Sequence, residues 1–463
     1  MASESSYLRS KLVAIALALC LTVSILVPNG REASHPVSVD STLIAATVND
    51  HWRSTVKHQL PAEFTRLTPQ QAMEAIAQEP KTAAAVSLKK PRRDSSYKAE
   101  AALAQLVAKP RDSQTIRRVF GALDADVATW IAATFPSTVG NLSGVGYRDR
   151  IAANRIRVAA AVEQSRSAPS PPRPWTETDR EPRQDLAKML TDRTKLIYFD
   201  PASNSGQGSW IELQGSLDRA QRIGVLIPGG SAFLVSENFT RYSTRAASFV
   251  SAGQGDLAML VWAGAPFPSG WVQEATSSWA KQAAPKLIDF VEDLNHRVDH
   301  DVRITLAGHS YGGAIVGISE KYGVDVDQVL HIASAGAGYG VDSVDDYRQP
   351  CRPRYAMMAP HDPISYVQDI PAFTGLGHGT SPSQLEGTKN VTTGFLPDDP
   401  LARDDVNRTL GSQGIAGKRI SGFHAHSEVF IKESGAWRNL FSVFMGRQPQ
   451  LRDAQPAASS RCS

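Results

Sequence analysis

The stretch from Val302 to Val316 decides the fold and reads Val-Arg-Ile-Thr-Leu-Ala-Gly-His-Ser-Tyr-Gly-Gly-Ala-Ile-Val. An apolar run typical of a buried strand ends at Ala307, and a helical pattern begins at Ala314. Between them, Ser310 stands at a sharp turn with a glycine two positions away on each side. Strand, turn and helix in this order are the context that a nucleophile elbow requires, so we expect Ser310 to be a catalytic nucleophile. The alternative interpretation is a glycine-rich turn without chemistry.

Short apolar runs alternate with helical ones over the C-terminal half of the chain. Uninterrupted apolar runs such as residues 222–227 suit a sheet that is covered on both faces. Helices are expected at residues 271–298 and 311–321, and the alternation predicts a mostly parallel sheet of the α/β class. The predicted strands are residues 195–199, 209–213, 222–227, 256–262, 302–307, 328–332 and 354–358.

A serine hydroxyl needs a base to take its proton, and the base needs an acid to orient it. In folds with this elbow the partners follow in the order serine, acid, histidine. Asp362 follows the predicted strand 354–358 directly, where the acid belongs, although an Asp-Pro turn would look the same. The competing carboxylates, Asp342, Asp345 and Asp346, lie in a polar loop well beyond their strand.

Two histidines near the C-terminus are candidates for the base. His424 and His426 lie in Gly-Phe-His-Ala-His-Ser-Glu, ahead of a final helical stretch. His309, His361 and His378 are weaker candidates, because the first should point away from the pocket and the others lie before or close to the acid in the chain. A metal site at the close pair lacks further ligands at convincing spacing, so neither a metal nor an organic cofactor is expected.

The loop after the predicted strand 222–227 is the candidate for stabilising a developing oxyanion. It reads Pro-Gly-Gly-Ser, and glycines let a backbone approach a substrate oxygen closely. One amide donor would come from Tyr311, at the start of the helix behind the nucleophile, and the other from Gly229, Gly230 or Ser231. An ordinary Pro-Gly turn is the alternative.

The N-terminus has the pattern of an export signal. Arg9 and Lys11 precede an apolar run over residues 12–27, and Pro-Asn-Gly follows it. Residues 1–33 are therefore expected to be a signal peptide or an uncleaved anchor, with membrane association possible in the second case. Outside the cytoplasm Cys351 and Cys462 could pair, or Cys462 could remain free in its polar segment.

The remaining chain divides by composition into four parts. Residues 34–165 read as a helical N-terminal region, which could serve as a partner-binding module, a lid or packing for the sheet. Residues 166–185 read as a linker, because several prolines forbid a helix there. Residues 186–447 form the expected catalytic domain, and residues 448–463 a polar tail expected to be disordered.

The charge balance weakens one class of partner. The 49 basic and 46 acidic residues give a net charge of +3, and no basic block interleaves with aromatic residues. Nucleic-acid binding therefore has little support.

Several segments resemble the actinobacterial α/β-hydrolase family long catalogued as a domain of unknown function. The likeness spans about residues 130 to 445, and the chain departs from it where relatives often have Pro-Gly-Thr in place of Pro-Gly-Gly-Ser. It implies an α/β-hydrolase fold with a Ser310, Asp362 and His426 triad, and the match to His-Ser-x-x-Phe at residues 426–430 favours His426 over His424. The other matching segments are residues 139–144, 148–150, 154–155, 228–229, 256–262, 308–312 and 334–338.

These expectations combine into one functional hypothesis. The chain would be an exported serine hydrolase, secreted or anchored in the cell envelope, that cleaves carboxylic esters such as envelope lipid esters through an acyl-enzyme. A thioesterase or peptidase with the same triad is the nearest rival, and a non-catalytic envelope binding protein on the same scaffold is the other. The oligomeric state is left open. Four aromatic residues could line an acyl pocket or belong to the core: Trp262, Phe267, Trp271 and Phe373.

Overall fold

The computed structural model describes most of the chain after its first forty residues. The described residues are 44–49, 60–90, 113–167, 182–234, 236–299, 301–368, 376–397, 417–459 and 462. The expected export signal at residues 1–33 and the helix expected at residues 97–108 lie outside them. Within the described part of the chain, no helix combines the length and the apolar character needed to cross a membrane.

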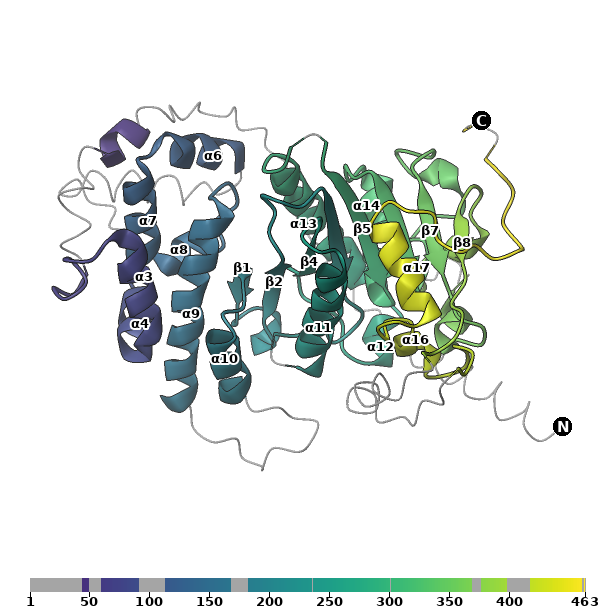
Figure 1. Ribbon diagram of the computed structural model, residues 1–463, viewed down its shortest axis with the longest axis horizontal. Helices are drawn as coiled ribbons and strands as arrows, with labels where there is room; N and C mark the ends of the chain where they lie inside the picture. Colours follow the sequence, from purple (N-terminus) through teal and green to yellow (C-terminus); the bar gives the residue numbers. More distant parts are fainter. Residues whose placement is uncertain are drawn as a thin grey trace, which may run out of the picture. The chain divides into compact units, whose positions relative to one another are not determined.

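An eight-stranded, mostly parallel sheet forms the centre of residues 182–459 (Figure 1). The strand order is β1-β2-β4-β3-β5-β6-β7-β8, antiparallel where β2 meets β1 and β4 and parallel from β4 to β8. This confirms the expected α/β class. The strands are β1 (Leu196–Asp200), β2 (Ser209–Gln214), β3 (Arg222–Ile227), β4 (Leu257–Ala263), β5 (Arg303–His309), β6 (Gln328–Ile332), β7 (Arg354–Met357) and β8 (Lys389–Val391).

Helices cover both faces of the sheet, which explains why its central strands are apolar without alternation. On one face, α11 (Glu237–Ala252) and α17 (Gly435–Phe444) pack side by side, with the rings of Phe249 and Trp437 stacked 5.2 Å apart (Figure 1). On the other face lie α13 (Ser278–Asn295) and α14 (Tyr311–Tyr322). Two short helices, α12 (Trp271–Glu274) and α16 (Ala425–Glu428), lie near the end of the sheet where the parallel strands finish.

The helix expected over residues 271–298 is interrupted between α12 and α13. The break has a tertiary cause, because distant groups take the carbonyl groups that a continuous helix would use. The Gly377 amide donates to the Ala275 carbonyl over 2.9 Å, and the Tyr311 hydroxyl donates to the Thr276 carbonyl over 2.8 Å. Strand β8 was also not predicted, since its three residues are too few and too polar to stand out.

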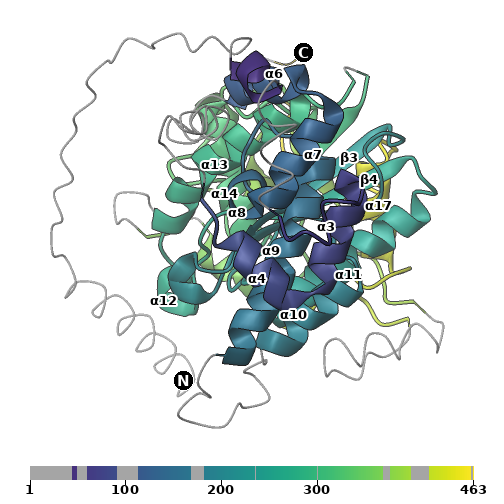
Figure 2. The same cartoon turned by 90° about the vertical axis from the view of Figure 1, so that its left-hand side faces the viewer.

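The N-terminal region is helical, as expected, and its described helices gather around α9 (Figure 2). It packs on the sheet edge, where the Asn141 side chain donates to the Phe199 carbonyl and accepts from the Phe199 amide, each over 2.9 Å. Asn141 thereby pairs the β1 backbone as a neighbouring strand would. The helices are α3 (Pro69–Gln78), α4 (Pro80–Ser87), α6 (Ser113–Ala122), α7 (Ala125–Thr134), α8 (Pro136–Val139), α9 (Tyr147–Ser167) and α10 (Pro182–Thr191).

The polar tail differs from its expected disorder. Residues 451–457 run beside β8, where the Arg452 amide donates to the Asn390 carbonyl over 2.9 Å. A disulfide then joins Cys462 to Cys351, 111 residues earlier in the chain. Closing a loop of this length stabilises a fold by about 4–5 kcal/mol in the chain-entropy model. The tail therefore covers β8, the last strand of the sheet, and the disulfide then ties its end to Cys351.

Candidate active site

Ser310 joins β5 to α14 in a strained conformation. Its φ of 55° and ψ of −124° are unusual for a residue with a side chain. A Cβ atom on Gly308 would lie 2.5 Å from the Gly312 carbonyl oxygen, and one on Gly312 would lie 2.3 Å from the Pro228 carbonyl oxygen. Both positions therefore require glycine, which is the steric reason for the spacing in the sequence. The turn holds the hydroxyl at the end of the parallel strands.

The structure brings His426 and Asp362 together. Asp362 follows β7 and is fully buried, and both of its carboxylate oxygens lie 3.1 Å from Nδ1 of His426. The carboxylate also accepts a hydrogen bond of 3.0 Å from the Ile364 amide, which fixes its orientation. Because a carboxylate only accepts, Nδ1 of His426 donates the hydrogen bond, and Nε2 is the ring nitrogen left to act as a base. This side chain is 26% exposed, so it can meet a substrate.

The competing candidates are placed elsewhere. His424 precedes α16 and is exposed, and among the described residues it is not paired with a carboxylate. Asp346 accepts hydrogen bonds from the amides of Asp342 and Ser343 in its own loop, which is a structural task. Within the described ranges, no three His, Cys, Asp or Glu side chains are arranged to hold a metal ion.

A buried chain of hydrogen bonds links the oxyanion loop to the histidine loop. The Gly229 amide donates to the Tyr242 hydroxyl over 2.9 Å, and that hydroxyl lies 2.6 Å from Nδ1 of His309. Nε2 of His309 lies 2.8 Å from the His426 carbonyl. A carbonyl only accepts, so Nε2 must carry the proton and Tyr242 must donate to Nδ1.

The state of His309 agrees with that assignment. Burial, followed by the charge of His426, holds the pKa of His309 well below its ordinary value, so its ring is neutral. The side chain is buried and holds the backbone of His426. The two rings lie 4.7 Å apart between centroids, which places the candidate base beside the elbow. No sequence motif pointed to Tyr242, because it reaches this position from α11.

Only one of the three candidate loop amides is free to bind an oxyanion. The Gly229 amide is taken by Tyr242, and the Ser231 amide donates to the Pro268 carbonyl over 2.8 Å. Among the described residues nothing accepts from the Gly230 amide. The Asn238 side chain donates to the carbonyl groups of Gly230 and Ser231 and so steadies this loop. Of the three loop residues predicted as oxyanion donors, Gly230 is thus the one whose amide remains available.

The loop and the elbow are in direct contact. A Cβ atom on Gly229 would lie 3.0 Å from the Ser310 Cβ and 3.4 Å from its hydroxyl oxygen. Tyr311 is the first residue of α14, so its amide has no acceptor within the helix and remains available as the second donor. Sequence reasoning missed a further residue at this place, Glu274, whose carboxylate rests on Gly230.

The expected acyl-pocket aromatics have a different placement. Trp262 lies in β4, and both Trp262 and Phe267 are 1% exposed in the core beneath the sheet helices. Trp262 and Phe267 therefore belong to the core, which was the favoured of the two interpretations. The Trp271 side chain and Phe373 lie outside the part of the chain whose side chains are described.

Comparisons with known proteins agree with this architecture. The model of a family described as alpha/beta hydrolase matches residues 200–372, less than half of the 463 residues. This segment begins in β1 and includes both Ser310 and Asp362. Among curated proteins, none matches the chain.

Solved structures resemble the chain only distantly. A dienelactone hydrolase from Anabaena variabilis is 14% identical, with a TM-score of 0.28 over 56% of this chain and 99% of that one. A predicted CIB-like hydrolase from Thermoplasma acidophilum is 15% identical, with a TM-score of 0.27 over 42% of this chain and 87% of that one. The esterase domain of a Rhodothermus marinus protein is 18% identical, with a TM-score of 0.23 over 37% and 78%.

The sheet order, the helices on both faces and the match of residues 200–372 together lead to one conclusion: this chain has the α/β-hydrolase fold, with a helical region before its sheet.

Proposed function

We propose that the protein is a serine hydrolase of carboxylic esters, with Ser310 as nucleophile, His426 as base and Asp362 as the orienting acid. The observation that carries the proposal is the hydrogen bond between His426 and Asp362. The carboxylate of Asp362 is fully buried, whereas the imidazole of His426 is partly exposed and lies beside the strained turn at Ser310. A buried carboxylate that touches one accessible histidine is the arrangement that a catalytic triad needs.

The first half of the reaction forms an acyl-enzyme. The Ser310 oxygen attacks the ester carbonyl carbon as its proton passes to Nε2 of His426, and the carbonyl electron pair moves onto the oxygen. The Gly230 and Tyr311 amides would hold that oxyanion. When the tetrahedral intermediate collapses, the alcohol leaves with the proton from His426.

The second half repeats these steps with water. His426 takes a proton from water, the hydroxide oxygen attacks the acyl carbon, and the Ser310 oxygen leaves with the proton that His426 returns. Throughout, Asp362 stabilises the imidazolium and keeps Nδ1 protonated. The protein residues supply every proton transfer in this scheme.

Two features support the proposal that the protein works outside the cytoplasm. The N-terminal residues have the pattern of an export signal, and the disulfide between Cys351 and Cys462 is of the kind that persists in oxidising compartments. In that setting, lipid esters of a cell envelope are a substrate class that the enzyme would meet.

A fluorophosphonate probe tests the chemistry directly. The wild-type protein should be labelled at Ser310 and should hydrolyse 4-nitrophenyl butyrate, whereas Ser310→Ala should do neither. A matched control is Ser319→Ala, since this serine lies in α14, the helix that follows Ser310, and its hydroxyl donates to the Ile315 carbonyl. Equal labelling of wild type and Ser310→Ala would refute the proposal, and a panel with thioester and peptide substrates would identify a different acyl bond.

A further inference from the structure

Glu274 places a carboxylate on the glycine that would bind the oxyanion. It is the last residue of α12. A Cβ atom on Gly230 would lie 2.0 Å from Oε1 of Glu274 and 2.4 Å from its carboxyl carbon. The carboxylate therefore covers the Cα atom of Gly230, next to the one loop amide that is free.

Hydrogen bonds with His378 and Tyr311 hold the segment that carries Glu274. Nε2 of His378 donates to the Glu274 carbonyl over 2.7 Å. The Tyr311 hydroxyl donates to the Thr276 carbonyl and accepts from the Ala280 amide, over 2.8 and 3.0 Å. The His378 ring meets the Tyr311 ring edge to face at 5.0 Å. The residue after the nucleophile thus anchors the segment that carries Glu274.

The carboxylate faces the catalytic space without a fixed cation. No lysine or arginine among the described residues forms an ion pair with Glu274, and the ionisable side chain that acts on its carboxylate is His426. Burial raises the pKa of Glu274, whereas protonation of His426 and a hydrogen bond from the Gly270 backbone lower it. The Glu274 carboxylate and the candidate base His426 are therefore close enough to influence each other's charge.

This placement creates an electrostatic conflict for a neutral ester. A negative carboxylate within a few ångströms of a developing oxyanion raises the energy of the transition state. The anchoring of α12 opposes movement of Glu274 away from the loop. A positive charge carried by the substrate would remove the conflict through its attraction to the carboxylate. A primary ammonium group would also donate a charge-assisted hydrogen bond, which a quaternary ammonium group cannot do.

We propose that Glu274 is a specificity-determining residue that selects esters with an ammonium group a few bonds from the scissile carbonyl. This inference rests on the proposed serine hydrolase activity and narrows its substrate class. The ammonium group could belong to the acyl part, as in an amino-acyl ester, or to the alcohol part, as in a choline ester. The same carboxylate would bind either group.

Two pairs of substrates that differ in one charge test the inference. The first pair is the 4-nitrobenzyl ester of L-alanine and that of propionic acid, at about pH 6.5 so that the α-amino group is charged. The second pair is butyrylcholine and its neutral isostere, 3,3-dimethylbutyl butyrate. The wild-type enzyme should prefer the cationic member of one pair by about tenfold or more in kcat/KM, because a unit positive charge is attracted to the carboxylate across a few ångströms. The pair that responds identifies the side of the ester.

Glu274→Gln should abolish that preference, chiefly by slowing the cationic ester. Glu237→Gln is the matched control, because Glu237 begins α11 and has a side chain that is 63% exposed. The control should keep the wild-type preference. A second measurement uses the wild type alone, in which tetramethylammonium should slow phosphonate labelling of Ser310 and tert-butanol should not.

The outcomes separate this inference from the activity on which it rests. If Ser310 is labelled and neutral esters are cleaved, but no cationic ester is preferred, the role of Glu274 is wrong and the hydrolase remains. The same conclusion follows if Glu274→Gln keeps the preference. If the probe does not label Ser310, the proposed hydrolase itself fails.

Discussion

Among the residues that the structure describes, two fully buried carboxylates face a histidine, and we assign chemistry to only one of the two pairs. Asp362 lies 3.1 Å from Nδ1 of His426, and Glu320 lies 3.9 Å from Nε2 of His331. Asp362 and Glu320 are 0% and 1% exposed. Burial of the carboxylate therefore does not distinguish the two sites.

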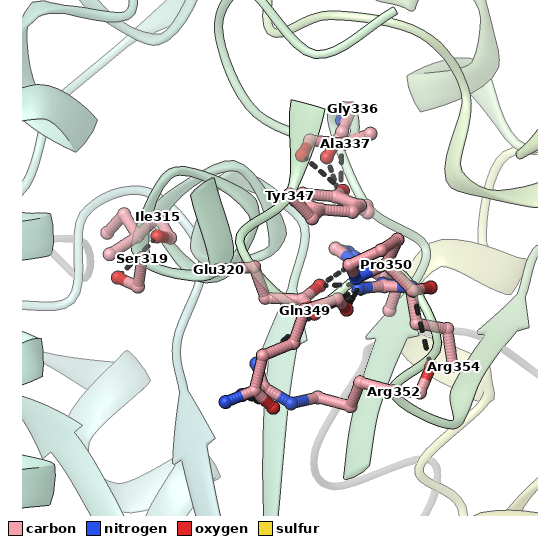
Figure 3. Close-up of polar contacts among 12 residues, drawn as sticks. Ile315, Ser319, Glu320, Gly336, Ala337, Tyr347, Gln349, Pro350, Arg352 and Arg354 are labelled. Carbon is pink, nitrogen blue, oxygen red and sulfur yellow. Dashed lines mark hydrogen bonds and ion pairs between the residues drawn. The ribbon is translucent and has the colours of Figure 1, made fainter. Parts of the chain in front are cut away.

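The partners of each carboxylate do distinguish them. Glu320 accepts hydrogen bonds from Arg354 over 3.1 and 3.2 Å and from Arg352 over 3.4 Å (Figure 3). Burial raises the pKa of Glu320, but His331 and Arg354 outweigh it and hold that pKa below its ordinary value. His331 is 1% exposed, so no substrate can reach it. This carboxylate is a permanent anion that neutralises two arginines.

The two sites are also the two ends of the same elements. Helix α14 begins next to Ser310 and carries Glu320 in its last turn. Strand β7 begins at Arg354, and Asp362 follows shortly after it ends. The ion pair of Glu320 with Arg354 thus joins the far ends of the helix and the strand whose near ends lie next to the proposed nucleophile and acid. A carboxylate beside a histidine indicates catalysis only where the histidine remains accessible.

Asp362→Asn should cause the largest effect, and the effect should be on catalysis. The asparagine amide would donate toward Nδ1 of His426, so the ring would carry its proton on Nε2 and could not take the Ser310 proton. We expect kcat/KM for a simple ester to fall roughly 10⁴-fold. The free energy of unfolding should change by only about 1 kcal/mol, because the amide oxygen can still accept from Ile364.

Steady-state kinetics and urea unfolding of the same Asp362→Asn preparation measure both quantities. Glu320→Gln serves as the comparison, since it removes the other buried carboxylate charge. Comparable losses of activity in the two variants, each with unchanged stability, would show that the two sites are not separated as we describe.

Glu320→Gln should instead destabilise the fold. It leaves the buried guanidinium groups of Arg352 and Arg354 without their counter-charge, which costs about 3–5 kcal/mol of unfolding free energy. The KM of the folded fraction should not change. Urea unfolding measures the loss, and Glu433→Gln is the control, because its pair with Arg438 is on the surface and is worth at most about 1 kcal/mol.

If Glu320→Gln unfolds no more easily than Glu433→Gln, the arginines must be stabilised by other groups. The carbonyl oxygens of Gln349 and Pro350 already accept from Arg354 over 2.7 Å each, and they would be the source of that stabilisation.

The sequence was most informative where sterics fix residue identity. The turn at Ser310 admits only glycine at positions 308 and 312, so the nucleophile-elbow pattern can be recognised from the sequence alone. Asp362 was predictable because a strand end places it, and parallel strands finish at one edge. The interpretation of His426 depended on a family resemblance, and the structure adds its contact with Asp362.

Other features depended on contacts between distant segments and left no local signal. Glu274 reaches Gly230 from a four-residue helix, and Tyr242 reaches His309 from the middle of α11. The helix break before α13 results from carbonyl groups taken by remote donors. The sequence could not decide whether Cys351 and Cys462 pair for the same reason, because the pairing depends on the path of the tail that carries Cys462.

Tyr242→Phe should have the smallest effect, and it tests whether the catalytic site has its own supporting network. The change removes the hydroxyl that accepts from the Gly229 amide and donates to His309. The oxyanion loop and the His426 backbone would both lose alignment. We expect kcat to fall about tenfold with little change in KM, because the lost alignment matters most in the transition state.

Tyr347→Phe is the matched control from the Glu320 site. Tyr347 is also buried, and its hydroxyl donates to the Ala337 carbonyl over 2.7 Å (Figure 3). Tyr347→Phe should lose about 1–2 kcal/mol of stability, since it leaves the Ala337 carbonyl without its donor. Tyr242→Phe should lose more, since both the Gly229 amide and Nδ1 of His309 lose a partner. Only Tyr242→Phe should lower kcat. If both variants lower kcat equally, alignment of the active site depends on general packing, and the chain through Tyr242 and His309 has no special part in it.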